Sequence, residues 1–126
     1  MSENLWPKVF PPPGVRTPVS ILREQALALG EVTSNIVLGG VDSSATNTGE
    51  FRHELYLRSA GLNYLTPLLV ITHTIDLYPV TVSTIGTGFV VRNAADPSEL
   101  MACLKDLFST PQVTKTIASL IAQSQE

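Results

Sequence analysis

The longest apolar stretch of the chain runs from Leu65 to Ser83 and is rich in Val, Ile and Thr. β-Branched residues suit the pleated surface of a sheet and are uncommon in long helices. The stretch therefore predicts sheet rather than helix. Because it is interrupted by His73, Asp76 and Pro79, it does not have the pattern of a membrane span.

Just before this stretch, residues 51–58 alternate between apolar and polar positions. One row holds Phe51, His53, Leu55 and Leu57, and the other holds Arg52, Glu54, Tyr56 and Arg58. Side chains of a strand point alternately to its two faces. The alternation predicts a strand with one packed face and one more polar face, which favours antiparallel pairing.

Further strands are expected on both sides of this one. The first covers residues 36–41, where Gly39 and Gly40 weaken the strand and indicate a bulge. Residues 42–49 predict a turn or loop. The central strand is expected over 64–74, the next from Pro79 to about Ser83, and a short fifth strand over 89–91, after a turn at 86–88.

Three helices are predicted from their start signals. Thr17-Pro18 and Thr110-Pro111 each join a capping residue to a proline, which is tolerated at the first helical position. Asp96-Pro97-Ser98-Glu99 has the form of a capping box. Apolar residues follow each signal at helical spacing: Val19, Leu22, Ala26 and Leu29; Leu100, Cys103, Leu104, Leu107 and Phe108; Val113, Ile117, Leu120 and Ile121.

The order of these elements predicts an α+β fold in two layers. One N-terminal helix and two C-terminal helices are expected to cover the apolar face of a mainly antiparallel sheet of four or five strands. At 126 residues, the chain has the size of one domain, which we place at residues 17–126.

Residues 1–16 are expected to form a proline-rich, extended leader, because Pro11, Pro12 and Pro13 favour polyproline II. The leader carries four large apolar side chains: Leu5, Trp6, Val9 and Phe10. Such groups are unfavourable in water, so they should pack against a protein surface. Two interpretations follow: the leader covers its own domain, which we favour, or it reaches a second subunit.

Composition narrows the possible partners. Charged residues make up only 15% of the chain and its formal net charge is −3, which argues against a nucleic-acid or anionic membrane surface. The low charge and the apolar leader favour a homodimer. The N-terminus does not have the basic and apolar parts of a signal peptide, so we expect a cytoplasmic protein.

Few residues are candidates for chemistry. His53, His73 and Asp76 could meet on adjacent strands, but their spacing has no metal-site pattern, and we expect no metal or cofactor. Cys103 lies in a helical apolar stripe, so we expect a buried, unreactive thiol. Gly86-Thr87-Gly88 predicts a hairpin turn more than a phosphate site, because no helix start follows it.

Two functional hypotheses follow. In the first, the chain is a non-catalytic interaction or adaptor protein, with no catalytic residue. It would bind a protein partner through a surface that includes arginine and aromatic side chains. Those candidates are Trp6, Phe10, Arg52, Glu54, Tyr56 and Arg58. In the second, it binds a small ligand, or is a small enzyme, with a pocket near His73, Asp76 and Tyr78. The polar strand row could instead be a solvated face held by Arg–Glu pairs.

Overall fold

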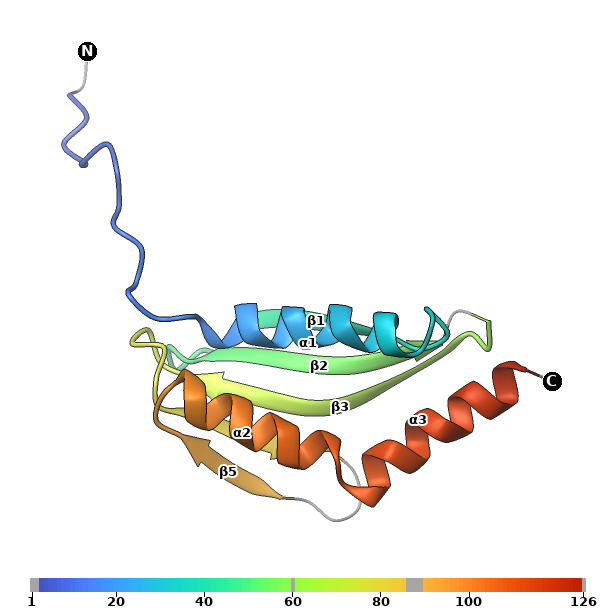
Figure 1. Cartoon of the computed structure of the whole chain (residues 1–126). Helices are drawn as coiled ribbons and strands as arrows, with labels where there is room; N and C mark the ends of the chain where they lie inside the picture. The colour runs from blue at the N-terminus through green and yellow to red at the C-terminus, as the bar shows by residue number, and fades with distance from the viewer. Residues whose placement is uncertain (1–2, 60, 86–89, 126) are drawn as a thin grey trace.

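The computed structural model describes residues 3–59, 61–85 and 90–125. It confirms the α+β fold: one N-terminal helix, a five-stranded antiparallel sheet and two C-terminal helices (Figure 1). The helices are α1 (Pro18–Val32), α2 (Pro97–Phe108) and α3 (Pro111–Ser124). The strands are β1 (Leu38–Ala45), β2 (Phe51–Ser59), β3 (Tyr64–His73), β4 (Val80–Thr84) and β5 (Val91–Ala94).

The sheet is an open meander. Its spatial order, β1-β2-β3-β4-β5, follows the chain, and every neighbouring pair is antiparallel. Antiparallel neighbours can be joined by short connections, so no helix is needed between strands. Each edge strand therefore has one side without a sheet neighbour among the described residues.

All three helices lie on one face of this sheet (Figure 1). The buried positions of β2 are His53, Leu55, Leu57 and Ser59, the row that faces the helices. Helix α1 packs closely on β1, since a Cβ atom added at Gly39 would lie 2.8 Å from the Cα atom of Ala26. The prediction that His53 faces the helical layer is confirmed.

The core is divided into two clusters. The larger cluster joins α1, α2 and the sheet around Leu22, Leu69 and Leu104, and the smaller one joins Val37, Leu57 and Leu120. Leu68 is half-buried and packs against both. Between α1 and the junction of α2 with α3, the helical layer leaves a groove that Leu68 lines.

Two of the three predicted cap signals act as expected. Thr17 Oγ1 accepts a hydrogen bond from Ser20 N (3.2 Å), and Asp96 Oδ1 accepts one from Glu99 N (2.8 Å). Thr110 makes no side-chain cap and donates instead to the carbonyl oxygen of Leu107 (2.8 Å). Its hydroxyl is therefore used to close the turn between α2 and α3.

The sequence prediction was wrong in three strand details. Strand β1 begins later and continues through Ala45, so residues 42–45 are not loop. Gly39 and Gly40 keep an unbroken register with β2, while the irregularity lies between Leu55 and Tyr56. The last strand is Val91–Ala94 rather than 89–91, and the predicted turn at 86–88 lies outside the described residues.

Candidate functional site

Among the described residues, no helix lies on the face of the sheet opposite α1, α2 and α3 (Figure 1). Arg52, Glu54, Tyr56 and Arg58 lie on it, because they alternate with the buried row of β2. Strand β2 is flanked by β1 and β3, so this row runs through the body of the sheet rather than along its edge. We call this surface, with its cross-strand neighbours, the open face.

Side chains on the open face are held by local contacts. Arg52 Nη1 and Glu54 Oε2 form an ion pair at 3.3 Å. Tyr56 lies opposite Gly40, and a Cβ atom at Gly40 would come within 2.2–2.6 Å of three atoms of the tyrosine side chain. The glycine thus leaves the space that the tyrosine ring occupies, which is why β1 carries a glycine there.

The rest of the open face mixes apolar and small polar groups. Leu65 lies opposite Arg58 and is exposed, whereas Val70, which lies opposite Glu54, is buried. On the far strands, Thr81 Oγ1 donates to Asn93 Oδ1 (3.1 Å). A surface that combines arginine, tyrosine and aliphatic groups has the composition of a protein interface.

The leader does not cover its own domain, which corrects the interpretation we favoured. It extends away from the body (Figure 1), and Leu5, Trp6, Val9 and Phe10 are all exposed, Trp6 by 74% and Phe10 by 65%. Trp6 and Phe10 contact each other with ring centroids 6.4 Å apart. In one copy of the chain, the predicted burial of Trp6 is therefore not seen.

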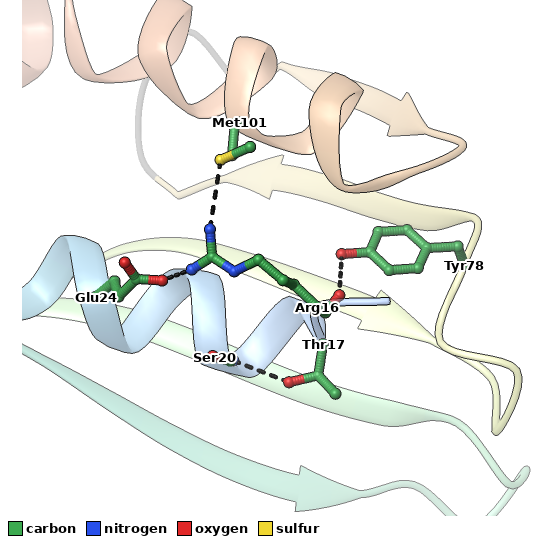
Figure 2. Close-up of polar contacts among 6 residues, drawn as sticks. All are labelled: Arg16, Thr17, Ser20, Glu24, Tyr78 and Met101. Atoms are coloured by element: carbon green, nitrogen blue, oxygen red, sulfur yellow. Dashed lines mark hydrogen bonds and ion pairs between the residues drawn. The ribbon is translucent and has the colours of Figure 1, made fainter. Parts of the chain in front are cut away.

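The base of the leader, by contrast, is fixed at Arg16 (Figure 2). Tyr78 Oη donates to the Arg16 carbonyl oxygen (2.9 Å). The Arg16 guanidinium pairs with Glu24 of α1 and lies 3.9 Å from the Met101 sulfur of α2. Arg16 therefore ties the leader to two helices and to the β3–β4 connection, and sets the direction in which the leader leaves.

A second cluster of polar side chains lies on the helical side of the sheet. His53 and His73 are both buried, with their Nε2 atoms 2.9 Å apart. Ser43 Oγ lies 2.7 Å from His53 Nδ1, and His73 Nδ1 lies 2.6 Å from the Thr74 carbonyl oxygen. Strands β1, β2 and β3, together with Thr74 directly after β3, thus supply a continuous series of four hydrogen-bonded groups.

Only certain proton positions allow every hydrogen bond in this series to form. The Thr74 carbonyl can only accept, so His73 Nδ1 carries a proton. When both rings are neutral, His73 Nε2 accepts from His53 Nε2–H, and His53 Nδ1 accepts from the Ser43 hydroxyl. Burial lowers the pKa of His53, and the nearby charges of His73 and Arg23 lower it further. The neutral arrangement therefore leaves Ser43 beside an unprotonated base.

The predicted set His73, Asp76 and Tyr78 is not joined into a site. Asp76 is exposed in the β3–β4 connection, and Tyr78 bonds the leader. In the described ranges, no hydrogen bond links these three residues, and none of them lines the five hollows found around the helices and the strand ends. His73 is used instead by the serine–histidine chain.

Other candidate chemistry gains no support. No group of three or more metal-binding side chains occurs among the residues described. Cys103 is buried, as predicted, and burial raises the pKa of its thiol, although Arg92 acts in the opposite direction. Over the same residues, no helix has the length and apolar character to cross a membrane.

Comparison with protein-family models, with curated proteins and with solved structures found no match for this chain.

Sequence reasoning missed Ser43 and Arg16. Ser43 was assigned to a loop, and only the register of β1, in which it lies opposite His53, brings it to the imidazole. Arg16 was the last residue of the predicted proline-rich leader and was assigned no contact. A signal for it was present, since an arginine directly before a capping threonine and eight residues before a glutamate can fold back along the first helix.

Proposed function

We propose that this chain is a non-catalytic interaction or adaptor protein that acts as a homodimer and binds a protein partner on its open face. The observation that carries this proposal is that the helices cover one face only, while the other presents Arg52, Tyr56 and Arg58 on an inner strand. Arginine and tyrosine are frequent in the residues that dominate binding energy at interfaces.

The local geometry supports recognition rather than catalysis at this surface. Tyr56 is held over Gly40, and Arg52 is paired with Glu54. A side chain that is already ordered loses less entropy when a partner binds. Small molecules favour concave pockets, and Arg52, Glu54 and Tyr56 do not line any of the hollows found in the described part of the chain.

Site-specific photo-crosslinking in an extract of the native cells tests this proposal. p-Benzoylphenylalanine replaces either Tyr56 or Tyr64; Tyr64 is an exposed tyrosine of the next strand that pairs with the buried Ser59, and thus belongs to the helical side. We expect a discrete adduct from position 56, and none of that mass from position 64. Arg58→Glu should remove the adduct, because it reverses a charge at the interface.

Equal adducts from both positions, or an adduct that Arg58→Glu leaves unchanged, would contradict a partner site on the open face. Circular dichroism of each variant serves as the control for folding.

One observation favours a second function, a small hydrolase centred on Ser43. Its hydroxyl is 2.7 Å from His53 Nδ1, and His53 Nε2 is 2.9 Å from His73. This is the order of nucleophile, base and orienting group that acyl transfer uses. Ser43 Oγ would add to an ester carbonyl while its proton passes to His53, which then protonates the leaving alcohol; water would release the acyl group by the reverse path.

A fluorophosphonate probe separates this alternative from the main proposal. If Ser43 is an activated nucleophile, the probe should label the native protein, and Ser43→Ala should abolish labelling. Ser44→Ala is the matched control, because the adjacent serine lies opposite Arg52 on the other face of the sheet. Absence of labelling, or labelling that survives Ser43→Ala, would reject the hydrolase.

A further inference from the structure

An apolar groove lies in the helical layer, on the face of the sheet opposite the open face. It has a volume of about 280 Å³ and is lined by the second half of α1, by β2 and β3, and by the junction of α2 with α3. All of its lining residues except Gln25 are apolar; Leu29, Leu57, Leu68, Phe108 and Ile117 are among them. Leu68, which packs against both core clusters, lies at this groove.

The groove has the chemistry and size for large side chains rather than for a soluble metabolite. Small-molecule sites usually exceed about 300 Å³ and include several placed polar groups. With a single polar lining residue, this groove offers little to orient a polar ligand, but it can shield aromatic or aliphatic groups from water.

The leader carries side chains of that kind, and they have no cover in one copy. Trp6 and Phe10 are largely exposed and contact each other. An aromatic side chain can bury about 150–250 Å². Within the chain, the exposed aromatic pair of the leader and the apolar groove are thus complementary surfaces.

The geometry of the leader separates it from its own groove. Arg16 is fixed beside the start of α1 by Tyr78 and Glu24, whereas the groove lies along residues 25–32 of the same helix. With a rise of 1.5 Å per residue, about 20 Å of helix lie between Arg16 and Leu29. The leader leaves from the N-terminal end of α1 and runs away from the body at a steep angle to that helix (Figure 1), and Pro11–Pro13 stiffen it as polyproline II.

We propose that the leader of one copy fills the groove of a second copy, so that two chains exchange their leaders around a twofold axis. Exchange of an identical element is a common route to a dimer, and it buries both leaders and both grooves at once. This inference rests on the proposed homodimer and names the surfaces that form it. The open faces stay free for another partner.

Two exposed positions of α1, one valine and one leucine, provide a matched test of the groove as the dimer contact. Val32 is 79% exposed and lines the groove, whereas Leu27 is 73% exposed and does not. Both accept a charge without disturbing the core. We expect Val32→Glu to raise the dimer dissociation constant at least ~10-fold, because a charge is placed beside an apolar contact. Leu27→Glu should change it by no more than ~2-fold.

The leader itself is tested by Trp6→Ala combined with Phe10→Ala. Loss of two buried aromatic groups should weaken the dimer at least ~100-fold, as measured by sedimentation. Trp6 is the only tryptophan, so its emission in the wild-type protein should shift to the blue as the concentration rises through the dissociation constant. Val32→Glu should move that shift to a concentration at least ~10-fold higher, and Leu27→Glu should leave it within ~2-fold of the wild-type concentration.

A crosslink then assigns the partner. p-Benzoylphenylalanine at position 6, in a mixture of isotope-labelled and unlabelled chains, should give mixed-isotope dimers joined to residues around the groove. A crosslink within one chain, a crosslink to the open face, or a wild-type monomer at high micromolar concentration would each overturn leader exchange. The crosslinks from position 56 report on the open face separately, so either result can fail alone.

Discussion

Gly39 is the point at which the packing of α1 on the sheet can be tested most directly. A Cβ atom at this position would lie 2.8 Å from the Cα atom and 3.0 Å from the Cβ atom of Ala26, and 3.1 Å from its carbonyl oxygen. Two of these three are backbone atoms, so a side chain cannot simply rotate away. Gly39→Ala must therefore push α1 off the sheet or distort β1.

The expected size of this effect follows from two opposing terms. Overpacking of a close contact costs about 1–3 kcal/mol, while replacing glycine by alanine stabilises by about 0.4–1 kcal/mol through the unfolded chain. The free energy of unfolding should therefore fall by up to about 2.6 kcal/mol. Gly61→Ala is the control, because nothing lies within 4 Å of its added Cβ atom, and it should be neutral or slightly stabilising.

Urea unfolding followed by circular dichroism at the helical band is the appropriate assay. Tryptophan fluorescence is unsuitable, since Trp6 is exposed in the leader and not in the core. The difference between the two alanine variants is the decisive quantity, because it cancels the common effect on the unfolded chain. If Gly39→Ala were as stable as Gly61→Ala, α1 could not approach β1 as closely as described.

Three further predictions concern other parts of the fold. Burial lowers the pKa of His53 below its usual 6.5, so the unfolded chain binds a proton more readily than the folded protein does. The free energy of unfolding in urea should therefore be constant above pH 6.5 and fall below it, by at most ~1.4 kcal/mol per pH unit for this group. A flat profile from pH 8 to 5 would contradict the burial of the His53–His73 pair. Cys103, buried and with a raised thiol pKa, should react slowly with a thiol reagent in the native protein and quickly in urea; fast native labelling would refute this. Asp96→Ala should lower the free energy of unfolding by about 0.5–2 kcal/mol through loss of its cap, and Thr110→Ala by less, since its side chain caps nothing; equal losses would argue against the assigned cap.

The sequence alone determined the local elements of this protein. The alternation over residues 51–58 is a property of neighbouring residues, and it correctly divided β2 into a buried row and a polar row. The Asp96 and Thr17 caps are also local, because a capping side chain reaches only three residues along its own chain. The same short-range periodicity correctly predicted most of the buried stripe of α2, but for α1 it omitted the buried Ile21.

Tertiary structure decided what these elements do together. Ser43 meets His53 because β1 pairs with β2 in one particular register, and register depends on contacts between strands rather than on either strand by itself. The outward course of the leader depends on contacts of Arg16 with residues that are up to 85 positions away. The groove depends on how far α1 and α3 diverge over the sheet, which no periodicity within one helix encodes.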